Sequence, residues 1–278
     1  MISRLDNGRV PASFCLRMRI LFIGDIVGKP GRHAVQAIVP RLVQEYSLDF
    51  VIANGENAAG GAGLTPDTAE ELFGGGVDVI TMGDHTWDQK EILQIIDREP
   101  RLLRPANFPQ GTPGNGAAVY DREGLPPIAV LNVMGRTFMR AIDCPFRAAL
   151  EEVEKLRAQT SIILVDMHAE ATSEKIAMGR FLDGKVTAVV GTHTHVQTAD
   201  EQIFPNGTAF LCDAGMCGPK ESVLGREIAP ILERYLTQMP KRFDIADGPV
   251  QFNGALIEVD EATGKATGIQ RINAVHPG

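Results

Sequence analysis

The chain has 278 residues, of which 44% are hydrophobic and 22% are charged, as in ordinary globular proteins that bury a substantial core. Its formal net charge is −8 and the sequence holds no basic cluster, which argues against long nucleic acid as a partner. No apolar run approaches the roughly 18 residues needed to cross a bilayer, and residues 1–17 lack the apolar core of a secretory signal. We therefore expect a cytoplasmic protein with no membrane partner.

Residues 1–17 carry no motif, and we expect them to form a mobile N-terminal extension. From residue 18 onwards, short β-branched runs alternate with amphipathic helical stretches, which predicts an α/β fold. No linker divides this part of the sequence, so a single domain is expected over residues 18–278. The predicted strands lie at 19–24, 50–54, 78–82, 128–133, 161–167, 186–191 and 208–212.

Helices are expected between these strands. Thr65 is a favourable N-cap, Pro66 suits the first helical position, and the helix should end at Gly74. Residues 146–158 repeat apolar side chains with the helical period. Near the C-terminus, apolar alternations at 250–259 and 266–272 flank a polar turn that contains glycine, which predicts a hairpin.

Carboxylate, amide and imidazole side chains follow five of the predicted strands within a few residues of the strand's end. In chain order they are Asp25, Glu56 with Asn57, Asp84 with His85, His168, and His193 with His195. Loops at the carboxyl ends of strands in an open α/β sheet meet at one crevice. Oxygen and nitrogen donors of these kinds bind metals such as Mn, Fe and Zn, so the sequence predicts a metal centre.

The pair His193 and His195 is the strongest single indication of metal binding. In an extended segment, residues two apart face the same side, so both rings are expected to reach a metal. Each of the other groups taken alone is explained as readily by a structural role, such as a turn or a helix cap.

Several blocks of the sequence together resemble a known family. They are Gly24-Asp25, Asn54-Gly-Glu56-Asn57, Gly83-Asp84-His85, Asp166-Met-His168-Ala-Glu170-Ala-Thr-Ser-Glu-Lys175, Gly191-Thr-His193-Thr-His195 and Asp213-Ala-Gly-Met-Cys-Gly-Pro219. These blocks resemble calcineurin-like metallophosphoesterases, and more narrowly the YmdB-like branch, whose members hydrolyse 2′,3′-cyclic nucleotides and related phosphodiesters. The resemblance covers roughly Met18 to the C-terminus, and it implies a four-layer αββα sandwich and a homo-oligomer.

The resemblance also implies roles for the residues named above. One metal ion would be held by Asp25, Glu56, Asn57 and His195. The second would be held by Glu56, Asp84, His168 and His193, with Glu56 bridging the two ions. Fe and Mn are the favoured metals, with Zn and Mg as the other candidates. A hydroxide activated between the metals would attack a small phosphodiester or cyclic nucleotide, and His85 would donate a proton to the leaving oxygen.

One position departs from the family pattern. The family block usually reads Gly-Asn-His, whereas this chain has Gly83-Asp84-His85. A carboxylate in place of an amide changes the charge at the second metal. Asp84 is also the one feature that favours an alternative function, a metal- or nucleotide-binding regulatory protein with little turnover.

Overall fold

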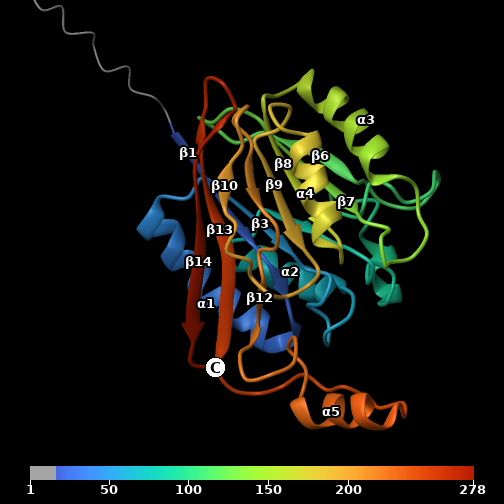
Figure 1. Cartoon of the computed structure of the whole chain (residues 1–278). Helices are drawn as coiled ribbons and strands as arrows, with labels where there is room; N and C mark the ends of the chain where they lie inside the picture. The colour runs from blue at the N-terminus through green and yellow to red at the C-terminus, as the bar shows by residue number, and fades with distance from the viewer. Residues whose placement is uncertain (1–16) are drawn as a thin grey trace, which may run out of the picture.

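The computed structural model describes residues 17–278, so the extension expected over residues 1–17 lies outside the described residues except for Arg17. Arg17 begins strand β1 (Arg17–Ile23). The described residues form a mixed α/β fold with two β-sheets and five α-helices, as the sequence predicts. The chain ends beside a long hairpin, β13 (Val250–Asp260) and β14 (Ala266–His276), at one side of the molecule (Figure 1).

The first sheet is built around β1, which pairs antiparallel with β13 and parallel with β3 (Phe50–Asn54). β3 is followed across the sheet by β4 (Val79–Thr81) and β5 (Leu102–Leu103), both parallel to it. On the other side of β1, β13 carries β14 along its outer edge. β12 (Met216–Pro219) pairs antiparallel with the start of β13, and β2 (Asp25–Ile26) pairs parallel with β12 at the edge of the sheet.

The second sheet has a parallel centre and antiparallel edges. Its order is β10-β11-β9-β8-β7-β6. The parallel strands are β7 (Ile128–Met134), β8 (Ile162–His168), β9 (Ala188–Thr192) and β11 (Ala209–Leu211). The antiparallel edge strands are β6 (Ala117–Tyr120) and β10 (Gln202–Ile203).

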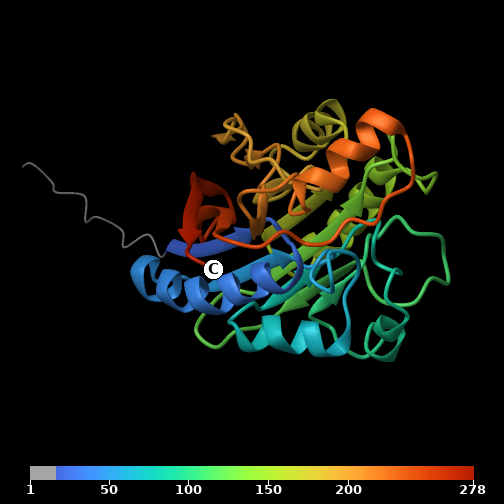
Figure 2. The same cartoon turned by 90° about the horizontal axis from the view of Figure 1, so that it is seen from below.

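Helices cover the outer faces of both sheets. α1 (Gly28–Tyr46) and α2 (Pro66–Gly74) pack on the first sheet, and α3 (Pro145–Arg157) and α4 (Thr172–Phe181) pack on the second. Figures 1 and 2 show the two helix pairs on opposite sides of the sheets. The short 3₁₀ helix η1 (Lys90–Gln94) also contacts α2. α5 (Ile228–Thr237) lies apart from both sheets, at the bottom of Figure 1.

The central strands are apolar along most of their length because both of their faces are buried. In β1, Leu21 and Ile23 pack in the core beneath α1 and α2, whereas Ile20 and Phe22 pack in the core between the two sheets. Val130 of β7 contributes to the same inter-sheet core. Strands buried on both faces read as continuous hydrophobic runs, which is why their positions could be predicted.

Each predicted strand is present, with bounds within two residues of those expected, except that β14 runs to His276 rather than to residue 272. The extra residues of β14 pair with β13 as far as His276 opposite Val250. The predicted start of α2 is confirmed, because the Thr65 side chain accepts a hydrogen bond from the backbone N–H of Thr68. No helix within residues 17–278 has the length and apolar character that a membrane span requires.

Candidate metal centre

The seven predicted metal ligands and the predicted proton donor His85 lie at the carboxyl ends of strands from both sheets. From the first sheet come Asp25 after β1, Glu56 and Asn57 after β3, and Asp84 and His85 after β4. From the second sheet come His168, the last residue of β8, and His193 and His195 after β9. The structure brings all eight side chains into one group, linked by the contacts described below.

Four of these residues present ligand atoms to a common point. Glu56, Asp84, His168 and His193 each offer one atom, and the four atoms lie within 4.8 Å of one another. Nε2 of His168 is 3.1 Å from Oε1 of Glu56 and 3.2 Å from Oδ1 of Asp84. Nδ1 of His193 is 3.3 Å from that Asp84 oxygen and 3.1 Å from Nε2 of His168. Such mixed carboxylate and imidazole sets suit Mn, Fe and Zn.

The buried side of the His168 ring determines which nitrogen faces this point. Its Nδ1 lies 2.9 Å from the hydroxyl of Thr192, and that hydroxyl donates a 2.6 Å hydrogen bond to Asp166. The hydroxyl proton is therefore committed to Asp166, so the hydroxyl accepts a hydrogen bond from Nδ1–H, and Nε2 is the nitrogen that faces Glu56 and Asp84. In metal sites, the ring nitrogen of a histidine that does not bind the metal typically donates a hydrogen bond to such an acceptor. Burial raises the pKa of Asp166 to about 6, against the opposing effects of His168 and Thr192.

A second group of donors surrounds Asp25. Oδ2 of Asp25 accepts a 3.0 Å hydrogen bond from the backbone N–H of His193, whereas Oδ1 is buried without a hydrogen-bond partner. Nε2 of His195 lies 3.6 Å from Oδ1 of Asp25 and 3.3 Å from the side-chain amide of Asn57. The same amide lies 3.3 Å from Oε1 of Glu56. Glu56 therefore stands between the two groups of donors.

These contacts fit metal ions on two further grounds. A buried carboxylate oxygen without a partner, as at Asp25, is costly unless a cation or donor completes it. Position 83 also has to be glycine, because a Cβ there would collide with Nε2 of His168 and with Glu56. Glycine at position 83 thus lets His168 and Glu56 approach each other, and Oδ1 of Asp25 is left to be completed by a cation or donor.

The electrostatics of the group favour positive charge. Burial lowers the pKa of His168, but Glu56, Asp84 and Asp25 together outweigh burial and raise it well above its ordinary value. Burial likewise raises the pKa of Asp25, but His195 and His168 outweigh it and leave the pKa low. Despite its partial burial, the pKa of Asp84 is lowered by the histidines as well, so Asp25 and Asp84 are ionised and stabilise a cation among the rings.

His85 lies at the edge of the group and has a different environment. Its side chain is 36% exposed, and its Nδ1 is 2.7 Å from Oδ2 of Asp88. The other ring nitrogen, Nε2, is 3.9 Å from Oδ2 of Asp84. The backbone N–H of His85 donates a 3.0 Å hydrogen bond to Oε2 of Glu56. His85 is thus anchored to the group through its backbone, while its ring remains accessible.

The segment that carries His193 and His195 is not extended, so the geometric reason given above for their facing the same side is wrong. β9 ends at Thr192, and both histidines adopt positive φ angles, 97° at His193 and 64° at His195. Non-glycine residues rarely adopt this conformation, which costs free energy that other interactions have to supply. The backbone N–H and the hydroxyl of Thr194, between the histidines, both donate to Oδ2 of Asp213, at 3.1 and 2.7 Å.

Asp213 is itself neutralised by a buried lysine. Nζ of Lys175, a side chain with no exposed surface, lies 2.6 Å from Oδ2 of Asp213. The other oxygen of Asp213 accepts a 2.8 Å hydrogen bond from the backbone N–H of Gly215. The ion pair joins α4 to the loop after β11 and holds Thr194 in place.

Several of these residues had no role predicted from the sequence. Asp88 follows His85 by three residues, and that spacing was a usable signal for a partner of the imidazole. Lys175 and Asp213 stand inside blocks that resemble the family, yet nothing in the sequence indicates that they pair. Glu170, whose Oε2 lies 3.2 Å from Nε2 of His193, likewise stands in a block without a predicted role.

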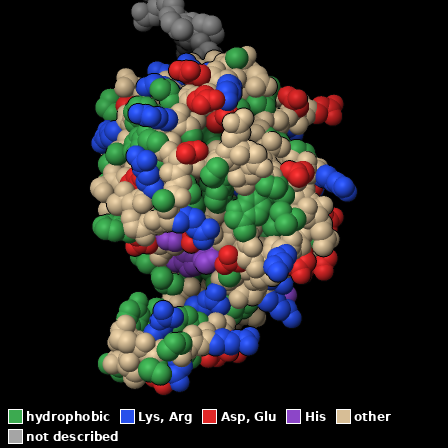
Figure 3. Space-filling model, turned by 90° about the vertical axis from the view of Figure 1, so that its right-hand side faces the viewer, with side chains coloured by type: hydrophobic (Ala, Val, Ile, Leu, Met, Phe, Trp, Pro, Cys, Tyr) green, Lys and Arg blue, Asp and Glu red, His purple; other side chains and the backbone are tan. Residues whose placement is uncertain are grey.

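A cavity of about 690 Å³ opens beside the group. Glu56, Asn57, His85, His193 and His195 line one end of it. Figure 3 shows histidine side chains in a cleft between the body of the molecule and the segment that contains α5. A concave site with convergent polar groups of this kind is the usual form of an active site.

A mixed α/β fold with carboxylates and imidazoles at the carboxyl ends of its strands, next to a cavity, defines a class of proteins that could hold a metal ion beside a ligand pocket. Comparison with known proteins narrows this class. The model of a family described as YmdB-like protein matches residues 21–272. The chain belongs to the YmdB-like family.

Individual relatives agree with this assignment. A protein of Bacillus subtilis (strain 168) named 2′,3′-cyclic-nucleotide 2′-phosphodiesterase is 51% identical over 255 residues, which cover 92% of this chain and 96% of that protein. A solved structure of a hypothetical protein from Thermus thermophilus has a TM-score of 0.88 at 41% identity and covers 94% of this chain and 100% of that one. A structure described as a novel phosphatase of Mycoplasma pneumoniae also has a TM-score of 0.88, at 34% identity, and covers 95% of each chain.

Proposed function

We propose that this protein is a metal-dependent phosphodiesterase that hydrolyses small phosphodiesters, with 2′,3′-cyclic nucleotides as its substrate class. The observation that carries the proposal is the convergence of Glu56, Asp84, His168 and His193 within 4.8 Å, beside an open cavity that Glu56 and His193 line. The name of the Bacillus subtilis relative, at 51% identity, supports the choice of substrate.

The proposal includes the architecture implied by the family resemblance. Helices on both outer faces and three separate hydrophobic cores support a four-layer αββα sandwich formed by one domain over residues 18–278. The cytoplasmic location and the homo-oligomeric state expected from the sequence belong to the same proposal.

Two metal ions would be held by two overlapping sets of ligands. Asp25, Asn57 and His195 would hold one ion, and Asp84, His168 and His193 the other, with Glu56 shared. The position of Glu56, 3.1 Å from His168 and 3.3 Å from the Asn57 amide, supports the bridging role. Fe or Mn suits this donor set best, with Zn or Mg as the other candidates. Bound there, the ions would lower the pKa of water and stabilise charge on the phosphoryl oxygens.

The chain's own contribution to the reaction is a proton. Hydrolysis forms a bond from water to phosphorus and breaks the bond to the 2′-oxygen, which leaves as an alkoxide unless it is protonated. His85 lines the cavity, and its Nε2 is the ring nitrogen that Asp88 does not hold. We assign Nε2 of His85 as the donor of that proton, and Asp88 as the residue that positions the ring.

The direct test uses 2′,3′-cyclic AMP with Mn²⁺ or Fe²⁺. We expect conversion to adenosine 3′-phosphate, complete loss of activity after chelation, and recovery when either ion is restored. Full activity in protein confirmed to be free of metal would contradict the metal-dependent mechanism. Bound metal or nucleotide without turnover would instead support the regulatory alternative raised by Asp84.

The Asp84→Asn substitution is expected to raise kcat/KM with Mn²⁺ as the only metal. The three carboxylates Asp25, Glu56 and Asp84 offset most of the charge of two divalent ions. Replacing one of them with an amide leaves the metal site more positive, so the site attracts an anionic phosphodiester more strongly. The asparagine amide also offers N–H donors that a carboxylate lacks. A gain of about tenfold corresponds to about 1.4 kcal/mol of transition-state stabilisation.

Metal content should be measured alongside these kinetics. Oδ1 of Asp84 lies within 3.3 Å of both His168 and His193, so the amide oxygen can take its place as a ligand. Loss of metal, or a fall in Mn²⁺-dependent activity, would show that the carboxylate is the better ligand at this position.

A further inference from the structure

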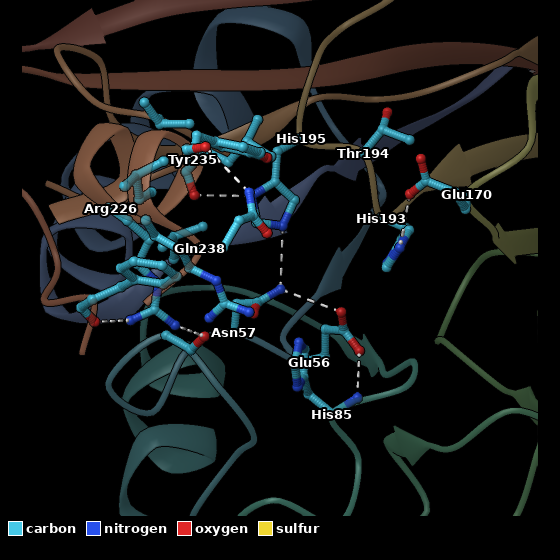
Figure 4. Close-up of a pocket in the computed structure, with 17 residues that line it drawn as sticks. Glu56, Asn57, His85, Glu170, His193, Thr194, His195, Arg226, Tyr235 and Gln238 are labelled. Atoms are coloured by element: carbon cyan, nitrogen blue, oxygen red, sulfur yellow. Dashed lines mark hydrogen bonds and ion pairs between the residues drawn. The ribbon is translucent and has the colours of Figure 1, made fainter. Parts of the chain in front are cut away.

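The cavity beside the metal centre extends well beyond the proposed ligands. Its volume of about 690 Å³ is in the range of pockets that hold whole drug-sized ligands, about 300–1,000 Å³, and a phosphate group fills only a small part of it. The end away from His193 and Glu170 is formed by α5 and the residues that follow it. Figure 4 shows Tyr235, Gln238 and Arg226 on one side of His195, and Glu170 and His193 on the other. The proposed mechanism uses none of the α5 residues.

Tyr235 is the aromatic residue of this wall with the most accessible ring. The side chain is 74% exposed although it lines the cavity, and within residues 17–278 neither its ring nor its hydroxyl has a partner. A flat aromatic surface left open beside a cavity is a platform for another planar group. Gln238 lies one turn further along, and its Nε2 donates a 3.1 Å hydrogen bond to the carbonyl of Tyr235. Its side-chain carbonyl therefore remains available as an acceptor.

Arg226 fixes this wall relative to the metal centre. Its guanidinium donates to the carbonyls of Gly60 and Gly61, in the loop that follows Asn57, and to that of Phe243 beyond α5. Within residues 17–278 Arg226 forms no ion pair, and Asp244 acts on its charge only at longer range. The aromatic platform is thus tied to the ligand loop by a cation that also favours an anionic substrate.

We propose that Tyr235 forms the nucleobase subsite of this enzyme, so that the base of a 2′,3′-cyclic nucleotide stacks on its ring while the cyclic phosphate lies at the metal centre. This inference rests on the proposed phosphodiesterase function. A stacked base is held by its π face, so purines and pyrimidines are both accepted, and Gln238 adds a hydrogen bond to the base edge. The subsite distinguishes cyclic nucleotides from cyclic phosphodiesters that lack a base.

The test compares two substrates that share a five-membered cyclic phosphate, 2′,3′-cyclic AMP and ethylene phosphate, which has neither sugar nor base. In Tyr235→Ala, kcat/KM for cyclic AMP should fall about tenfold or more, the loss expected on removing one base–aromatic stack. The value for ethylene phosphate should stay within about twofold of the wild type, since stacking contributes nothing to it. Tyr235→Phe keeps the ring and should retain activity on both substrates. Adenosine should compete with cyclic AMP in the wild type but only weakly in Tyr235→Ala.

Leu236→Ala is the matched control. Leu236 is the next residue of α5, is 85% exposed and does not line the cavity, so its removal should change neither substrate's kinetics. Equal changes for both substrates in Tyr235→Ala, or no change for cyclic AMP, would overturn the subsite while the phosphodiesterase function stands. If the wild-type protein hydrolyses neither substrate, the proposed function itself fails, and the subsite fails with it.

Discussion

Replacing His85 with alanine is expected to lower kcat on 2′,3′-cyclic nucleotides by about 10²–10⁴-fold while both metal ions remain bound. The loss follows from removing a proton donor for a leaving alkoxide. Metal is retained because His85 contacts Glu56 through its backbone N–H, which alanine keeps, and because its ring is 36% exposed rather than packed among the donors. Steady-state kinetics and metal analysis of the same preparation measure the two effects together.

Substrates with different leaving groups sharpen this prediction. A p-nitrophenyl phosphodiester releases a phenolate that needs little protonation, so His85→Ala should lose much less activity on it than on a cyclic nucleotide. Asp88→Asn should cause a smaller loss on the cyclic nucleotide, because Asp88 orients the His85 ring without donating the proton. An equal loss on both substrates would show that His85 is not the proton donor.

His168→Ala serves as the contrasting variant. The His168 ring has no exposed surface, and its Nε2 lies next to Glu56 and Asp84. Its removal should therefore deplete the second metal ion as well as activity. If His85→Ala and His168→Ala lose metal to the same extent, the division between proton donor and ligand is incorrect.

Lys175→Met is expected to lower the free energy of unfolding by about 3–5 kcal/mol, the usual cost of leaving one member of a buried ion pair without its partner. Both side chains of the pair are almost fully buried, at 0% exposure for Lys175 and 1% for Asp213. Methionine replaces the aliphatic part of lysine, so the effect isolates the loss of charge. Urea unfolding followed by circular dichroism measures it.

The matched control is the exposed pair formed by Lys155 and Glu151, whose nitrogen and oxygen lie 2.8 Å apart. Lys155→Met should change stability little, because water screens such pairs. The double variant Lys175→Met with Asp213→Asn should recover part of the loss, since no buried charge is then left unpaired. A loss in Lys175→Met no larger than that of Lys155→Met would show that the buried pair does not stabilise the fold.

Lys175→Met should also affect the metal centre. With Lys175 gone, Asp213 is less well held, and Asp213 is the acceptor for the backbone N–H and hydroxyl of Thr194. Thr194 keeps His193 and His195 in their positive-φ conformations, so metal affinity should fall along with stability. Thr194→Val, which removes only the hydroxyl bond, should weaken metal binding with a smaller effect on unfolding.

Local sequence determined the positions of the strands, the start of α2 and the C-terminal hairpin. These features depend on periodicity, capping and turn chemistry, which act over a few residues. The donors at the strand ends were visible for the same reason, because each lies within a few residues of the end of an apolar run. The strand β14 was predicted too short because its last residues are held by pairing with β13 rather than by their own apolar pattern.

Tertiary structure alone decided which of these donors meet and what supports them. Lys175 pairs with Asp213 across 38 residues of sequence, and Asn54 hydrogen-bonds Asp166 across 112. The first pair depends on how α4 packs on the second sheet and the second pair on how the two sheets face each other, and no local pattern encodes either. The conformation of the His193–His195 loop was mispredicted because contacts from Asp25 and Asp213 override the extended conformation expected after a strand. The wall formed by α5 depends on Arg226 reaching the carbonyls of a loop 165 residues earlier, a contact that exists only once the chain has folded.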